Sequence, residues 1–135
     1  MTVQRSTAVR NARLDAIEST IGTAAKVQIR TGAQPANCAA AASGTLLVEF
    51  ALGSDWAAAA SGGVKAFSST PVAGTAVATG TAAHYRIVDT AGTTCHEQGT
   101  VTATGGGGDV TIDNTSIVSA QAVNINSWSV TEPGA

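Results

Sequence analysis

Four side chains that can do chemistry lie close together between residues 82 and 101: His84, Cys95, His96 and Glu97. Histidine titrates near neutral pH and binds metals, and a cysteine thiolate is a nucleophile. The stretch could therefore hold a metal ion or a nucleophile with its base. The choice depends on where the strand that carries each residue directs its side chain.

The two histidines are weak candidates for a metal site. A turn near residue 91 would bring His84 and His96 roughly opposite each other on antiparallel strands, but no third ligand is fixed by spacing. The two cysteines lack the CxxC spacing of a zinc site. Asp109 and Asp113 are not followed by the loop pattern and terminal Glu of a calcium site. We therefore expect no metal and no cofactor.

The spacings do not favour a catalytic pair either. Cys95 and His96 are adjacent in a predicted strand, so they point to opposite faces and cannot share a proton. The glycine run 105–108 is not followed by Lys-Ser or Lys-Thr, so it reads as a linker and not as a phosphate loop. We expect no catalytic residue and interpret the protein as a non-enzyme.

Two further pairs leave alternatives open. Cys38 and Cys95 are a possible disulfide, which would close a loop of roughly 57 residues (95 minus 38) and add about 4 kcal/mol in the chain-entropy model. In a reducing cytosol they would instead be separate thiols. Trp56 and Trp128 could stack on a sugar if they were exposed, although packing in the core or at its rim is the favoured interpretation.

Composition predicts one folded domain. The chain has 135 residues, of which 44% are hydrophobic and only 12% charged, with a formal net charge of −2. Disordered chains combine low hydrophobicity with high net charge, so this one should fold. The seven Lys and Arg residues are scattered, so nucleic acid is not an expected partner. The start MTVQRSTAVR lacks the apolar core of a signal peptide, and no stretch approaches a membrane span, so we expect no membrane association.

A helix is predicted from about Val3 to Ile21, because Leu14, Ile17 and Ile21 recur at helical spacing and Gly22 is a stop signal. Ser6 or Thr7 could cap its start. The apolar seam is too narrow to stabilise a lone helix in water. The helix must therefore pack on its own β-domain or on another subunit.

After Gly22 the apolar period changes to two, which indicates strands. A turn at Asp89 to Gly92 joins the arms of a hairpin, a long loop covers 32–44, and Ser54 or Asp55 could cap a short helix. We predict a mainly β protein, an antiparallel β-sandwich or jelly-roll-like domain of seven or eight strands over residues 23–135, preceded by an arm and one helix over residues 1–22. The expected strands are 25–31, 45–52, 64–68, 83–88, 94–103, 109–112 and 123–130, with 71–80 a loop or weak edge strand.

Several segments, taken in order, resemble small structural proteins encoded in the head gene clusters of tailed bacteriophages and prophages. The matching segments are Leu14 to Gly22, Arg30 to Ala33, Pro35 to Cys38, Ser54 to Trp56, His84 to Ile87 and Thr93 to Val101. The resemblance implies a capsid decoration or cement protein, made in the host cytoplasm and located on the capsid surface of the virion. Such proteins are β-rich, often trimeric, and bridge subunits of the major capsid protein. No catalytic residue comes with the resemblance.

Contacts with the capsid or with neighbouring subunits are expected on the N-terminal arm and helix. The basic residues could pair with an acidic capsid surface, although a solvated helix face is the alternative. A tail or head-fibre component, or a carbohydrate-binding β-sandwich that attaches to a host surface, are the alternative functions. The residues expected to make the contacts are Arg5, Arg10, Arg13, Leu14, Ile17 and Ile21.

Overall fold

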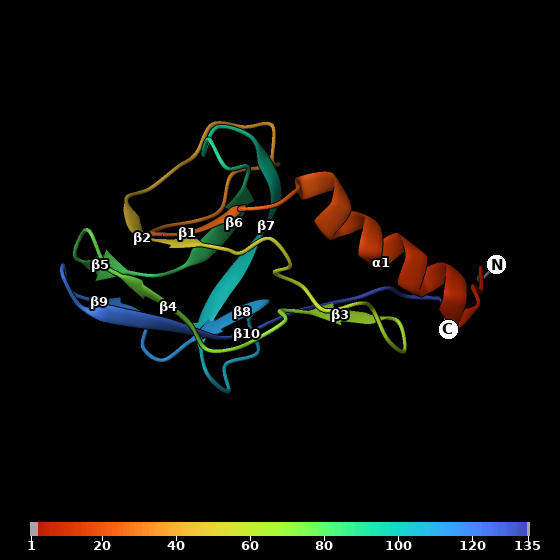
Figure 1. Cartoon of the computed structure of the whole chain (residues 1–135). Helices are drawn as coiled ribbons and strands as arrows, with labels where there is room; N and C mark the ends of the chain where they lie inside the picture. Colours follow the sequence, from red (N-terminus) through yellow and green to blue (C-terminus); the bar gives the residue numbers. More distant parts are fainter. Residues whose placement is uncertain (1–2, 135) are drawn as a thin grey trace.

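The computed structural model describes residues 3–134. Residues 1 and 2 of the predicted arm and residue 135 of the predicted β-domain lie outside the described residues. One helix precedes ten strands (Figure 1). In chain order the elements are α1 (Thr7–Ile21), β1 (Lys26–Arg30), β2 (Leu46–Ala51), β3 (Val64–Ala66), β4 (Val72–Thr75), β5 (Gly80–Thr81), β6 (His84–Val88), β7 (Cys95–Ala103), β8 (Val110–Ile112), β9 (Ser116–Ile117) and β10 (Ala122–Thr131).

The mainly β fold with one N-terminal helix is confirmed. An eight-stranded sheet runs in the order β2-β1-β6-β7-β8-β10-β3, with β4 paired to β10 beside this path, and it curls around the core (Figure 1). A separate two-stranded sheet joins β5 to β9. Ser6 caps the helix by accepting a hydrogen bond from the Val9 amide, and Gly22 ends it with a φ of 92°. The two local signals read from the sequence therefore set both helix ends.

The sheet is mixed, whereas the sequence predicted antiparallel pairing throughout. β7 and β8 run parallel, with Val101 opposite Val110, although only residues 104–109 connect them. Parallel neighbours ordinarily need a much longer crossover. Here the glycine run folds back on β7, because the Thr102 hydroxyl accepts a hydrogen bond from the Gly108 amide at 2.9 Å. The segment interpreted as a flexible linker is thus a compact loop that returns the chain to the start of a parallel strand.

The short helix expected after Asp55 is absent. Residues 57–61 are extended: Ala57 bridges Phe67 and Ser61 bridges Val64, so the segment forms a hairpin with β3. The Ala57 amide donates to the Glu18 carboxylate at 3.1 Å, and the Ala60 amide donates to the Asp15 carboxylate at 2.8 Å. The amides of Ala57 and Ala60 therefore bind carboxylates of α1, and residues 57–61 do not form a helix of their own.

The core fills the inside of the curled sheet, and an aromatic group closes it near the helix. Phe67 stacks on Trp128 with ring centroids 4.9 Å apart, and Trp56 lies 5.6 Å from Trp128. The Trp56 indole also donates to the Gly22 carbonyl at the end of the helix. The aromatic group thereby joins the helix to the sheet.

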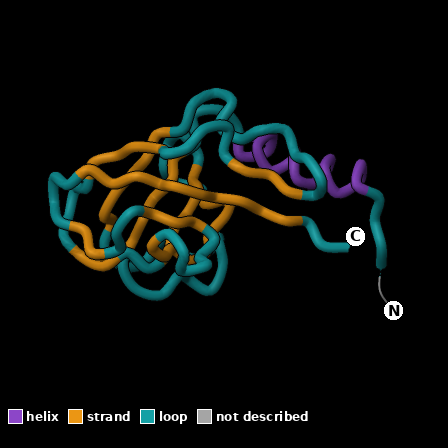
Figure 2. The backbone as a smooth tube through the Cα atoms, turned by 90° about the horizontal axis from the view of Figure 1, so that it is seen from below, coloured by secondary structure: helices purple, strands orange, loops and turns teal. Residues whose placement is uncertain are grey.

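The helix, the β3 hairpin and the end of β10 extend together away from the curled sheet, as Figures 1 and 2 show. We call residues 3–21, 57–67 and 129–134 the projection. Ser129 to Thr131 pair with β3, and the Arg5 amide donates to the Gly134 carbonyl at 2.6 Å. Both ends of the described chain lie at its tip (Figure 2).

Candidate functional site

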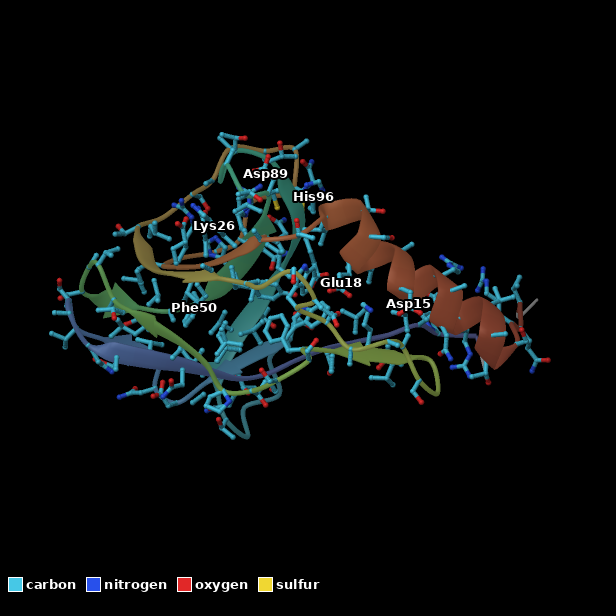
Figure 3. All side chains as sticks on the ribbon, in the orientation of Figure 1. Asp15, Glu18, Lys26, Phe50, Asp89 and His96 are labelled. Atoms are coloured by element: carbon cyan, nitrogen blue, oxygen red, sulfur yellow. The ribbon has the colours of Figure 1, made fainter. Side chains whose placement is uncertain are left out.

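A buried lysine holds the projection together. Lys65 on β3 is 2% exposed, and its ammonium lies 2.9 Å from Asp15 Oδ1 and 3.5 Å from Glu18 Oε2. The Ala58 carbonyl accepts a third contact at 2.9 Å. Asp15 and Glu18 lie on the side of α1 that faces the β3 hairpin (Figure 3). A buried ammonium needs such partners, since burial without them is costly.

The same cluster lines an open hollow between the helix and residues 54–59. The hydrogen bond from the Ala60 amide, followed by that from Lys65, holds the pKa of Asp15 below its usual value. An ionised carboxylate and a buried ammonium 2.9 Å apart form a stable ion pair. Lys65 therefore has a structural role that fixes the helix on the hairpin.

The three apolar residues expected to make capsid or subunit contacts lie on the side of the helix that faces its own sheet. Leu14 is 1% exposed, and Ile17 and Ile21 pack, partly buried, against the core. The contact expected of Leu14 is thus made within its own chain. The sequence left open whether the apolar side of the helix packs on its own β-domain or on another subunit. In the structure it packs on its own β-domain.

The three arginines lie on the projection and engage the C-terminal end of the chain. Arg13 is half exposed and forms an ion pair with Glu132 at 2.8 Å. The Arg10 guanidinium reaches the Glu132 carbonyl, and it occupies the space where a side chain at Gly63 would lie. Arg5 is bound through its backbone to Gly134. Their charge is therefore partly satisfied within the chain, while Arg13 remains accessible.

Large apolar side chains are exposed at two ends of the molecule. Val3, Val9 and Val64 are exposed on the projection, and Val77 and Val118 are exposed beside β5 and β9 at the opposite end (Figure 1). Val9 lies two residues before Asn11, whose side chain accepts a hydrogen bond from the Gly63 amide, so Val9 is on the side of α1 away from the hairpin. Val64 precedes Lys65, which faces the helix, so Val64 points away from the helix and the two valines do not form one patch. The projection also carries the accessible Arg13, so it is the candidate contact site.

A second feature is the outer face of the sheet, which the loop 31–45 covers. Strand register places Glu49, Gln28, Arg86 and Gln98 side by side on four neighbouring strands. Arg86 donates to two loop carbonyls, those of Cys38 at 2.8 Å and Ala40 at 3.0 Å. Gln98 donates to the carbonyl of loop residue 35 at 2.7 Å. This row of polar side chains explains how a loop without regular structure keeps one position.

Cys38 in that loop contacts Cys95 at the start of β7. Both are free thiols, and Cys95 Sγ lies 2.8 Å from Cys38 Sγ. Burial, followed by the neighbouring Cys95, raises the pKa of Cys38 to about 11. The thiol is therefore uncharged at neutral pH and a poor nucleophile. The two residues lie where a disulfide could form, and that bond stays a prediction.

Because the pKa of Cys38 is raised from 9.0 to about 11, its contribution to stability is present below pH 9 and falls as the pH rises towards 11. In that window the unfolded thiol loses its proton before the folded one does. We expect urea midpoints measured from pH 8 to 11 to fall less steeply in Cys38→Ser than in the wild type. Equal slopes would contradict a buried, protonated Cys38, and Ser43→Ala in the same loop is the control.

The two histidines do not meet. His84 is buried, pairs with Thr100 across the hairpin, and binds the Gly32 carbonyl through Nδ1 at 2.8 Å. His96 is exposed at an irregularity in the pairing of β6 and β7. The expectation that they lie roughly opposite each other was wrong, because the register pairs His84 with Thr100, four residues beyond His96 (100 minus 96). The extra residue at the irregularity accounts for only one of these four positions. Among residues 3–134, no group of three or more His, Cys, Asp or Glu side chains could hold a metal ion.

Both tryptophans belong to the core. Trp56 is 4% exposed and Trp128 is 1% exposed, so neither ring can stack on a sugar in this conformation. The Trp128 indole and the Tyr85 hydroxyl both donate to the Glu97 carboxylate, at 2.8 Å and 2.5 Å. Glu97 thus serves two buried donors inside the sheet. Burial, and then the Glu97 charge, raise the pKa of Tyr85, which keeps its hydroxyl a donor.

Two residues with important contacts were not singled out from the sequence: Lys65 and Arg86. Each lies in a short strand of three or five residues, too short for its alternation to show that a charged side chain is buried. Only Arg86 carried a signal that could have been used, since it lies between residues predicted to face inward in the most strand-like stretch.

Comparison with known proteins gives no relative: no family model, no curated protein and no solved structure matches the chain. In the described part of the chain, no helix is long and apolar enough to cross a membrane.

Proposed function

We propose that this protein is a virion structural protein, a capsid decoration or cement protein that binds the major capsid protein lattice and stabilises the head. The observation that carries the proposal is the projection, which exposes Val9 on the outer side of its helix and Val64 on the outer side of its hairpin, and which keeps Arg13 accessible. The sequence resemblance supplies the partner. The protein is placed on the capsid surface of the virion, after synthesis in the host cytoplasm, as a homo-oligomer and by resemblance a trimer.

The mechanism is linkage. A protein that binds one form of a lattice and not another stabilises the form that it binds, by an amount that grows with its free concentration. A fixed contact surface loses little conformational freedom on binding. The ion pairs of Lys65 with Asp15 and Glu18 provide that fixation, because they hold the helix on the β3 hairpin before any partner is present.

A tail or head-fibre component is the second candidate, and one observation favours it. Val77 and Val118 are exposed at the end of the molecule opposite the projection. Contact surfaces at both ends suit a component that joins two neighbours in a row, since a head-to-tail contact that does not close produces a filament. A decoration protein needs only one of them.

Substitution of an acidic residue at each end tests the proposal. We expect Val9→Asp/Val64→Asp to lower occupancy on purified capsid shells at least tenfold, because a carboxylate would have to be buried in the contact. The matched control is Val77→Asp/Val118→Asp, at the opposite end, which should bind as the wild type does. Occupancy is measured by co-sedimentation and by locating the protein in particle images, with folding checked by circular dichroism.

The outcomes separate the candidates. Unchanged occupancy of the projection variant would remove the projection as the attachment site. Loss of end-to-end association in both variants, with no binding to shells, would favour the fibre component. Native mass measurement tests the trimer, and a monomer at high protein concentration would contradict it.

A further inference from the structure

A small, partly open cavity lies between the outer face of β1 and β6, the loop 31–45 and the turn that follows β6. Its volume is about 170 Å³, and its lining includes Gln28, Arg30, Arg86 and Thr93. A water molecule in the liquid takes about 30 Å³, so the cavity has room for several waters or for one small ion. It is separate from the projection, which contributes none of the lining residues.

The lining has two positive charges and no negative one. Arg30 and Arg86 are diagonal neighbours on adjacent strands, because Arg86 lies opposite Gln28 and Arg30 lies opposite His84. Burial, and then the charge of Arg86, lower the pKa of Arg30. Two carboxylates adjoin the lining without belonging to it. Glu49 is bound by Gln28 at 2.9 Å and by Lys26 at 3.3 Å, and Asp89 accepts from the Thr93 amide at 2.9 Å.

The donors of these two arginines are only partly used. Arg86 is 3% exposed, and although its Nη2 donates to the loop carbonyls, its Nε has no hydrogen-bond partner. Arg30 donates through Nε and Nη2 to Gln28, and through Nη1 only to the Gly44 carbonyl at 3.4 Å. A buried arginine nitrogen without an acceptor is costly.

We propose that this cavity binds a small oxyanion of the phosphate or sulfate class, held by Arg30 and Arg86 beneath the loop 31–45. Guanidinium groups match the oxygens of such ions in charge and geometry. A bound oxyanion balances two neighbouring positive charges and offers an acceptor to the Arg86 Nε, which otherwise has none. It also connects the loop to the sheet, because Arg86 already binds the Cys38 and Ala40 carbonyls.

The experiment is a titration of the full chain with inorganic phosphate and with sulfate, at an ionic strength held constant with sodium chloride. Binding is followed by calorimetry and by the nitrogen NMR signals of the arginine side chains. We expect saturable binding of one ion per chain and a shift of the Arg86 Nε signal. Arg30→Gln should weaken binding at least tenfold, since it removes one charged donor group. Arg13→Gln, on the projection, is the matched control and should bind as the wild type does.

A parallel titration with acetate separates the classes of oxyanion. Acetate is expected to bind more weakly than phosphate and sulfate. Equal binding would overturn the assignment to the phosphate or sulfate class. A response that follows ionic strength alone, or equal binding by Arg30→Gln, would overturn the site itself. Arg30 lies at the end of β1 and is partly exposed, so its substitution is expected to leave the fold intact, which circular dichroism checks. Failure of this site would leave the proposed capsid contact untouched.

Discussion

The double variant Asp15→Asn/Glu18→Gln is expected to lower the thermal midpoint by roughly 10–20 °C, because it leaves the ammonium of Lys65 buried without a counter-charge. Lys65 is 2% exposed, and in the double variant its acceptors are all neutral: the Ala58 carbonyl at 2.9 Å and the amide oxygens of the substituted residues. The loss comes from the burial of Lys65 and Glu18, whose side chains are 2% and 19% exposed, whereas water reaches the half-exposed Asp15 and weakens its share.

Adding Lys65→Met to the double variant should restore most of the loss. Methionine fills a similar volume without charge, and replacing all members of a buried ionic group by apolar residues is often neutral. The measurement is thermal unfolding by circular dichroism for the wild type, the double variant and the triple variant. Asp55→Asn is the matched control, since Asp55 lines the same hollow without contacting Lys65.

If the triple variant is no more stable than the double variant, the loss has a different cause, such as the amide hydrogen bonds of Ala57 and Ala60. Those bonds explain why Asn and Gln are the substitutions chosen: both keep an oxygen acceptor for the amides and remove only the charge. The comparison therefore isolates the electrostatic part of the cluster.

The elements that sequence reasoning predicted correctly are those whose signals are local. Ser6 and Gly22 mark the ends of α1, and the turn at Asp89 closes the hairpin because its carboxylate accepts the Thr93 and Thr94 amides. Such features depend on residues within one turn of each other. These features can therefore be predicted without knowing the rest of the fold.

The predictions that failed depended on distant partners. An alanine run after Asp55 favours a helix by propensity, yet its amides bind carboxylates of Asp15 and Glu18, about 40 residues earlier in the chain. Likewise, the parallel pairing of β7 and β8 depends on how the glycine run folds back on Thr102. Neither outcome leaves a periodic pattern in the sequence.

The structure changes which residues of the predicted contact region are exposed, and the contact itself stays a prediction. The helix was expected to make the contacts, and it does form one side of the projection. Its apolar seam, however, is used within the chain, since Leu14 is buried there. The exposed valines that replace it come from three separate segments, and only the folded chain brings Val64 of β3 to the same end as Val3 and Val9.

The largest effect of a single apolar substitution is expected at Trp128. Trp128→Ala should lower the free energy of unfolding by about 3–5 kcal/mol, the range for a buried aromatic residue replaced by alanine. Its ring is 1% exposed and lies against Phe67 and Trp56, at centroid distances of 4.9 Å and 5.6 Å. The substitution also removes one of the two donors that satisfy the Glu97 carboxylate.

Trp128→Phe separates these two contributions. Phenylalanine keeps an aromatic ring beside Phe67 but has no N–H, so the remaining loss should be about 1–3 kcal/mol, as for a hydrogen bond to a charged group. Urea unfolding followed by circular dichroism measures both variants, with Val130→Ala, further along β10 and partly exposed, as the matched control. A loss below about 1 kcal/mol in Trp128→Ala would contradict a packed aromatic group.

The position of Trp128 adds a functional consequence. Trp56 and Phe67 flank the β3 hairpin, and residue 129 begins the part of β10 that pairs with β3, so the aromatic group lies at the base of the projection. Its loss should raise amide hydrogen exchange in residues 57–67 before it does so in β1 and β6. Under the proposed function, Trp128→Ala should then weaken shell binding below the global unfolding temperature, because the contact surface must be ordered again on binding. Shell binding equal to that of the wild type, with exchange raised only in the projection, would show that a fixed projection is not required.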